Sequence, residues 1–295
     1  MEYDLASGEK SVTADHTNKI PPQRRARSDE KMIIAPYRDD LVKIVILNPK
    51  GGCGKTTLAT NLASYFALRG PPPTLIDIDP NGYAAHWLKR RPSNSCKIHG
   101  IADYMLSIHG TRTWPLRIPK ETGTVIIDTP SALARHEIRE LTYDADCILI
   151  PALPSAFDIH TTTNFIAELL LLTELERPVA VVASRTRQDT NSLAVLLRIL
   201  TSLETPTIAV LRDSQNYVHA ADLGLGLYEL PHHRVKKDLE QMDRVIDWLD
   251  RQLMRTMKPE LISVYDSQPE LPTKRYIYDA PNPCASPATA LSHLD

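Results

Sequence analysis

The chain has 295 residues, of which 42% are hydrophobic and 24% are charged, and its formal net charge is −2. This composition is ordinary for a globular protein with one large core. It excludes a general electrostatic attraction of the whole molecule to nucleic acid, so any such binding must come from a local patch.

No stretch approaches 18 consecutive apolar residues, and the N-terminus lacks the apolar segment of a signal peptide, so we expect a cytoplasmic protein without a membrane partner. The four cysteines show no C-x-x-C spacing, which predicts free thiols and neither a disulfide framework nor a zinc site. They are Cys53, Cys96, Cys147 and Cys284.

Residues 1–40 mix both charges without periodicity, which predicts a disordered N-terminal arm. Within it, Gln23–Arg27 (QRRAR) is a compact basic patch. Contact with nucleic acid and a simple solvated tail cluster are both compatible with that patch. Residues 258–295 contain six prolines, which predicts an extended or disordered C-terminal tail.

Between the two ends, apolar runs alternate with segments of helical periodicity, which predicts an α/β fold over residues 41–257. Such alternation is typical of a mostly parallel sheet with helices on both faces. The predicted strands are 41–48, 74–78, 123–128, 146–151, 178–184 and 206–211. The predicted helices are 56–69, 83–90, 98–107, 132–142, 158–175, 190–203, 214–223 and 235–254.

The most informative segment is Lys50–Thr57 (KGGCGKTT), which lies between the first strand and the first helix. A glycine-rich loop at a helix N-terminus presents free N–H groups and a partial positive charge, both of which favour a phosphate. Lys55 would reach the β- and γ-phosphates, and the Thr56 hydroxyl would bind Mg²⁺. A glycine-rich turn with chance lysines is the alternative, but the flanking strand and helix favour the phosphate loop. We therefore expect a P-loop nucleotide site made by Lys50, Gly51, Gly52, Cys53, Gly54, Lys55, Thr56 and Thr57.

Two aspartate-bearing segments follow. In TLIDIDPNGYA, Asp77 and Asp79 lie two residues apart at the end of a short strand, so both are expected on one face near the phosphates. The alternative is that one of them caps the following helix. In TVIIDTPSAL, Asp128 ends a β-branched run, as in a Walker B segment, and would hold Mg²⁺ through water.

These motifs, in this order, resemble the ParA/MinD family of cargo-positioning ATPases, whose deviant Walker A box has the form KGGxGKTT. Pro49 stands where the ordinary box has its first glycine, and Lys50 is the additional lysine of the deviant form. The resemblance implies that Lys50 crosses a dimer interface to the partner's nucleotide. It also implies that Asp79 orients the attacking water, so that Lys50, Lys55 and Asp79 are the catalytic residues.

The resemblance extends over residues 41–255. Residues 145–169 resemble the segment that forms much of the family's dimer face, and residues 181–191 and 208–230 resemble its last strands and nucleotide-base loop. By the same resemblance, Arg185, Arg187 and Arg212 match arginines that bind DNA without sequence preference. Gln215 replaces a further arginine, which makes this patch thinner.

The implied function is that of a molecular timer that uses ATP and Mg²⁺. ATP would drive formation of a homodimer that binds nucleoid DNA, and a cargo-bound partner protein would stimulate hydrolysis and release. The cargo would be a plasmid, a chromosome, or a protein body such as a carboxysome or a chemoreceptor cluster. The alternatives are an ATP-dependent synthetase on the same fold, an iron protein of the nitrogenase type, and a scaffold that binds nucleotide without turnover. The cysteine settings disfavour the iron protein.

Overall fold

The computed structural model describes residues 41–102, 118–173, 177–187 and 190–256. The predicted N-terminal arm with its QRRAR patch and the predicted C-terminal tail therefore lie outside the described residues.

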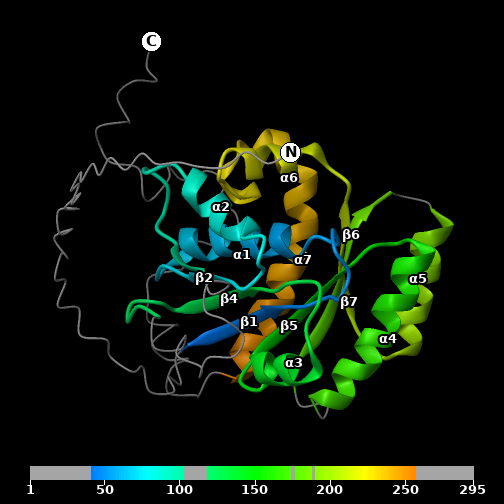
Figure 1. Cartoon of the computed structure of the whole chain (residues 1–295). Helices are drawn as coiled ribbons and strands as arrows, with labels where there is room; N and C mark the ends of the chain where they lie inside the picture. Colours follow the sequence, from blue (N-terminus) through cyan, green and yellow to red (C-terminus); the bar gives the residue numbers. More distant parts are fainter. Residues whose placement is uncertain (1–40, 103–117, 174–176, 188–189, 257–295) are drawn as a thin grey trace, which may run out of the picture. The chain divides into compact units, whose positions relative to one another are not determined.

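The described part of the chain contains a seven-stranded sheet in the order β3-β2-β4-β1-β5-β6-β7. Every neighbouring pair is parallel, as the alternation of strands and helices predicted (Figure 1). The strands are β1 Val42–Ile46, β2 Thr74–Asp77, β3 His99–Ala102, β4 Thr124–Asp128, β5 Cys147–Ala152, β6 Val179–Thr186 and β7 Thr207–Arg212.

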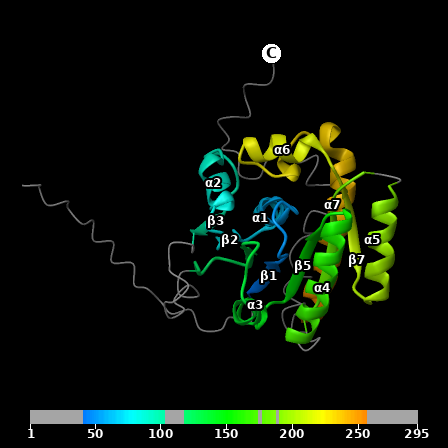
Figure 2. The ribbon, with the colours of Figure 1, turned by 45° about the vertical axis from the view of Figure 1, so that its right-hand side comes forward.

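Helices connect the strands and cover both faces of the sheet (Figures 1 and 2). They are α1 Lys55–Arg69, α2 Tyr83–Arg90, α3 Arg135–Thr142, α4 Ala156–Leu172, α5 Asn191–Ser202, α6 Gln215–Asp222 and α7 His232–Thr256. A short 3₁₀ helix, η2 Leu227–Glu229, precedes α7. No helix in these described ranges is long and apolar enough to cross a membrane.

The core forms two layers because successive side chains of a strand point to opposite faces. In β1, Ile44 and Ile46 join the layer made with α1, α2, η2 and α7. Val45 and Leu47 join the layer made with α3, α4 and α5. β1 is apolar at almost every position because both of its faces are buried, as is usual for a parallel sheet.

The central strands end at one level, which brings their following loops together. Ile46 of β1 pairs with Asp128 of β4, and Asp128 pairs in turn with Asp77 of β2. The loop after β1 therefore lies beside the end of β4 with Asp128, and the end of β2 with Asp77 lies one strand farther along the sheet.

Two predictions were wrong. Residues 98–107 were predicted as a helix, but residues 99–102 form the edge strand β3. Its backbone groups pair with β2, a tertiary contact that local periodicity does not reveal. Free thiols were predicted at all four cysteines; Cys53 and Cys147 are free, but Cys96 is disulfide-bonded. The spacing of cysteines along a chain does not report which of them meet in the fold.

Candidate nucleotide-binding site

The phosphate loop owes its shape to glycines in left-handed conformations. Gly52 has φ 74° and Gly54 has φ 101°, and Gly54 is the N-cap of α1. A Cβ on Gly54 would lie 3.7 Å from Ser184, an ordinary contact, so the backbone conformation and not crowding requires glycine there. The loop thus turns directly from β1 into the N-terminus of α1, as the phosphate-binding prediction requires.

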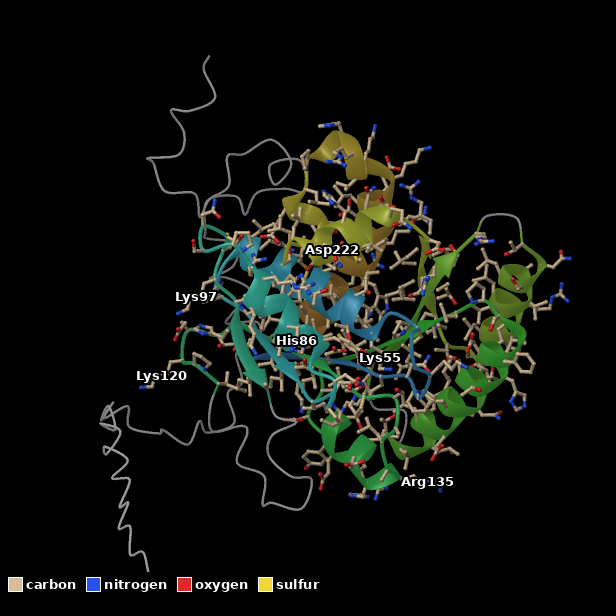
Figure 3. The ribbon with its side chains drawn as sticks, turned by 45° about the horizontal axis from the view of Figure 1, so that its top comes forward. Lys55, His86, Lys97, Lys120, Arg135 and Asp222 are labelled. Carbon is tan, nitrogen blue, oxygen red and sulfur yellow. The ribbon has the colours of Figure 1, made fainter. Side chains whose placement is uncertain are left out.

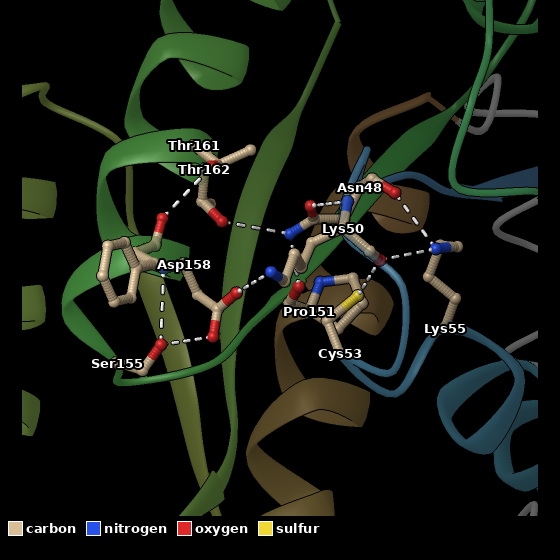
Figure 4. A network of polar contacts seen from close by, with 10 residues as sticks. Asn48, Lys50, Cys53, Lys55, Pro151, Ser155, Asp158, Thr161 and Thr162 are labelled. Carbon is tan, nitrogen blue, oxygen red and sulfur yellow. Dashed lines mark hydrogen bonds and ion pairs between the residues drawn. The ribbon is translucent and has the colours of Figure 1, made fainter.

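Lys55 is held over the loop by backbone carbonyl groups. Its side chain is buried, and its Nζ donates to the carbonyl oxygens of Asn48 and Lys50, each at 3.0 Å (Figures 3 and 4). These bonds keep a buried ammonium group satisfied at the loop. A phosphate oxygen can replace either carbonyl as an acceptor, so the geometry suits the predicted contact with the β- and γ-phosphates.

Thr56 and Asp128 meet beside the loop, although 72 positions separate them in the sequence. The Thr56 hydroxyl donates to Asp128 Oδ2 at 2.6 Å, while the buried Asp128 Oδ1 has no hydrogen-bond partner. Burial raises the pKa of Asp128 to about 7, and the charges of Asp77 and Asp79 add to the rise, against the bond from Thr56 and the charge of Lys55. A buried carboxylate oxygen without a partner, beside a hydroxyl, fits a divalent cation, because carboxylate and hydroxyl oxygens are the ligands of Mg²⁺.

The two aspartates after β2 have different environments. Asp77 accepts bonds from the backbone N–H groups of Asp79 at 3.1 Å and Ala85 at 2.8 Å. For Asp77 the capping alternative therefore holds, since Ala85 lies in the first turn of α2. Burial raises the pKa of Asp77 above its ordinary value. Asp79 Oδ1 accepts hydrogen bonds from the backbone and side-chain nitrogens of Asn81, at 2.9 and 2.8 Å. These bonds fix the Asp79 carboxylate in the loop. The predicted role of Asp79 in orienting water stays a prediction.

Lys50 points away from its own loop, toward α4. Its Nζ lies 3.1 Å from Asp158 Oδ1, and the side chains of Lys50 and Asp158 are 44% and 10% exposed (Figure 4). Asp158 is fixed by Ser155, the N-cap of α4, through both its backbone N–H and its carboxylate. Lys50 and Lys55 therefore occupy different surroundings, even though both belong to one motif.

Asn48 and Asp158 are site residues that the motif did not include. Asn48 Oδ1 accepts from Lys50 N at 2.8 Å, and its Nδ2 donates to Pro151 O at 2.7 Å and to Thr162 Oγ1 at 3.2 Å. Asn48 thus ties the loop to β5 and α4. One local signal was available for Asp158: it stands three residues after Ser155, the spacing of a capped helix start.

A cavity of about 320 Å³ lies between the loop after β4 and the helices α3 and α4. An ion pair between Arg135 Nε and Glu168 Oε1, at 2.5 Å, joins α3 to α4 at this cavity. None of the predicted phosphate-loop residues, Lys50–Thr57, lines it, but Asn48 and Pro49 do, so the cavity adjoins the phosphate loop on the side of α3 and α4.

The three arginines predicted to bind DNA lie at the ends of β6 and β7, but they differ in how closely a carboxylate pairs with them. Arg212 is bound by the fully buried Asp238 of α7, through Nε at 2.6 Å and Nη2 at 3.0 Å. Arg185 is 62% exposed, and its Nε lies 3.4 Å from Asp213 Oδ1. Arg187 is exposed, and no carboxylate of the described residues pairs with it.

Residues 44–227 match the family model described as the CobQ/CobB/MinD/ParA nucleotide binding domain. The chain belongs to this family. The predicted relationship to ParA/MinD ATPases is confirmed, and with it the α/β fold and the ATPase class.

Individual relatives agree with this membership. The chain is 28% identical over 192 residues to "Maintenance of carboxysome distribution protein A" of Halothiobacillus neapolitanus, covering 63% of this chain and 87% of that protein. It is 50% identical over 118 residues to the chromosome-partitioning ATPase Soj of Thermus thermophilus, covering 38% of this chain and 46% of Soj. In fold, the chain resembles the structure of apo McdA from Cyanothece, with a TM-score of 0.55, 19% identity, and coverage of 70% of this chain and 99% of that one.

Proposed function

We propose that this ATPase is a nucleotide-dependent dimer that positions a protein body in the cell, with DNA as the surface on which it is retained. The observation that carries the proposal is the difference between the two lysines of the loop. Lys55 is buried against carbonyl groups of its own loop, whereas Lys50 is 44% exposed and directed outward to α4. A lysine of the first kind suits a nucleotide in the same protomer, and a lysine of the second kind can reach the nucleotide of a second copy.

ATP with Mg²⁺ is the proposed cofactor pair. Thr56 and Asp128 would hold the cation, which when bound neutralises charge on the phosphates and links them to the protein. Asp79 would orient a water molecule for attack on the γ-phosphate. Because reciprocal Lys50 contacts would require the γ-phosphate, its loss on hydrolysis would weaken the dimer. Each round of ATP hydrolysis would thus end in dissociation of the dimer.

A protein body is the cargo favoured by the relatives. Two of them carry the name "Maintenance of carboxysome distribution protein A", and they align over 87% and 94% of their lengths. The aligned part of the partitioning ATPase Soj is shorter, at 46% of that protein. A cargo-bound partner protein would stimulate hydrolysis, and the ATPase itself would be associated with the nucleoid.

Size-exclusion chromatography with light scattering tests the dimer step, using wild type, Lys50→Ala and Lys55→Ala with ATP or ADP. The wild type is expected to dimerise with ATP only. Lys55→Ala should bind no nucleotide, while Lys50→Ala should bind ATP yet stay monomeric at concentrations at least tenfold above those at which the wild type dimerises. Lys89→Ala, an exposed lysine on α2, is the control and should behave as wild type. A Lys50→Ala protein that dimerises normally with ATP refutes the proposed role of Lys50 across the interface.

A further inference from the structure

The beginning of α7 carries an unusual concentration of positive charge. Its first six residues read HHRVKK, and its first turn contains no acidic residue. A helix N-terminus carries a partial positive charge, so cations placed there are unfavourable and acids are preferred. The first turns of α7 thus violate a local rule of helix stability, and such violations are expected where a residue serves binding and not folding.

These charges face solvent and are not neutralised. His233, Arg234, Lys236 and Lys237 are exposed, and within the described ranges no carboxylate forms an ion pair with Arg234, Lys236 or Lys237. Two acids follow closely in the sequence: Asp238 is fully buried and already bound by Arg212, and Glu240 is exposed, one turn after Lys236, but forms no ion pair with the cluster in the part of the chain that the structure describes. His233, Lys236 and Lys237 have the i, i+3, i+4 spacing of one helix face, where Cβ atoms lie about 5–6 Å apart.

The contacts of Asp238 connect this basic face of α7 to the ends of β6 and β7. Asn216 of α6 donates to the Arg234 carbonyl oxygen at 3.1 Å and to Asp238 Oδ2 at 2.6 Å. Arg212, another partner of Asp238, pairs across the sheet with Thr186, and Arg187 follows Thr186 directly. Figures 1 and 2 show α6 beside the start of α7. Arg187 and the α7 cluster therefore belong to neighbouring parts of one region, in which Arg212 is the member whose charge is paired with a buried carboxylate.

We propose that the exposed basic residues at the start of α7, principally Lys236 and Lys237 with Arg234, bind the phosphates of double-stranded DNA, while Arg212 supports this surface through Asp238. The inference rests on the proposed function, which requires DNA contact but does not locate it. Lysine contacts with phosphates carry no sequence information, so the surface would bind unrelated duplexes equally.

An anionic membrane is disfavoured as the ligand by the other side of α7. A helix that lies in a membrane surface needs an exposed apolar face next to its basic residues. The apolar residues nearest to the cluster, Val235, Leu239 and Met242, are at most 1% exposed, because they pack into the core. Within α7 the cluster therefore offers charge without an exposed apolar face, as suits binding to a phosphate backbone.

The test compares Lys236→Glu/Lys237→Glu with Lys89→Glu/Arg90→Glu, which reverses two adjacent exposed charges on α2. The two variants change the net charge equally. Affinity is measured by fluorescence anisotropy with two unrelated labelled duplexes, in ATP and in ADP, at several salt concentrations. The α7 variant should bind both duplexes at least tenfold more weakly, and its salt dependence should be shallower by about 0.9 in log–log slope for each phosphate that is no longer neutralised. The α2 variant should stay within about twofold of wild type.

The α7 substitutions should not impair folding, because both side chains are exposed and neither forms an ion pair with a carboxylate of the described residues. A melting temperature equal to or above that of wild type would confirm that the weaker binding does not come from unfolding.

Equal decreases in the two variants would attribute binding to net charge and overturn the proposal, as would unchanged affinity in the α7 variant. Binding of wild type to phosphatidylglycerol vesicles but to neither duplex would overturn DNA as the ligand. Selective weakening in the α7 variant of a protein that never dimerises with ATP would support this surface and refute the dimer switch, so the two proposals can fail separately.

Discussion

Asp128→Asn should make the metal-free protein more stable at neutral pH while removing Mg²⁺-dependent ATP turnover. In the folded chain, burial raises the pKa of Asp128 to about 7, whereas an unfolded aspartate has a pKa near 3.8. A carboxyl group with a raised folded pKa contributes stability that is fully present below the unfolded pKa. This contribution is lost as the pH rises through the interval between the two values. Asparagine keeps an acceptor for Thr56 and does not ionise.

The size of the effect follows from the interval of pH. Between pH 5 and pH 7 the advantage of asparagine should grow by about 2 kcal/mol, since each pH unit within the interval corresponds to about 1.4 kcal/mol and the folded carboxyl group is already half ionised at pH 7. The measurement is urea unfolding at both pH values in EDTA, because bound Mg²⁺ would stabilise the ionised form. Any constant effect of the substitution cancels in the comparison between the two pH values.

The same substitution at Asp222, an exposed carboxylate, is the control and should give no such growth. A difference between wild type and Asp128→Asn that is the same at pH 5 and pH 7 would refute the assignment of a buried, destabilising carboxylate to this site. Mg²⁺-dependent turnover that survives in Asp128→Asn would refute its role in holding the cation.

Three further predictions concern the loop after β2, the ion pair between α2 and η2, and the contact of η2 with α1. Asp79→Ala should bind Mg-ATP and form a dimer that persists for longer than the wild-type dimer, because the phosphate contacts remain while the group that orients water is removed. A rate of phosphate release by this variant equal to that of wild type would contradict this. Arg91→Met should lower the free energy of unfolding by about 3–5 kcal/mol, because it removes the cation that pairs with Glu229, whose Oε1 lies 2.5 Å from Arg91 Nη2 and whose side chain is only 7% exposed. Among the described residues, the carboxylate keeps only the neutral donors Ser64 Oγ and Gly226 N. Chemical denaturation measures this, and a decrease below about 1 kcal/mol would refute it. Gly226→Ala should cost about 1–3 kcal/mol in the same assay, because its Cβ would come within 2.5 Å of Ser64 Cβ on α1, and an unchanged unfolding midpoint would show that α1 moves aside freely.

Much of the fold was predictable because most strands are buried on both faces and read as continuous apolar runs. The strand predicted at 206–211 forms at Thr207–Arg212, and the helix predicted at 83–90 has those bounds. β3 was not predictable in this way: it is an edge strand of four residues with a glycine, and its identity comes from pairing with β2.

For the site, the contiguous motif predicted the loop, and strand ends predicted Asp128. The partners that distant elements supply could not be predicted from the sequence. Periodicity along the chain does not indicate that Asp158 would meet Lys50, or that Asp238 would bind Arg212. These contacts decide whether a given cation is available for a ligand. The sequence therefore identified the basic residues, but not which of them are already paired with a carboxylate inside the protein.

In each protomer, Asp158 would compete with the partner's nucleotide for Lys50. If Lys50 serves the partner's nucleotide, forming the dimer requires both internal pairs to open. If the pair contributes about 0.5 kcal/mol, about one lysine in three is free at any moment. Because two are needed, the apparent dissociation constant of the dimer would be about tenfold higher than that of protomers with both lysines free. Salt weakens the internal pairs together with the contacts across the interface, so dimerisation should respond to ionic strength less steeply than the number of interfacial charges suggests.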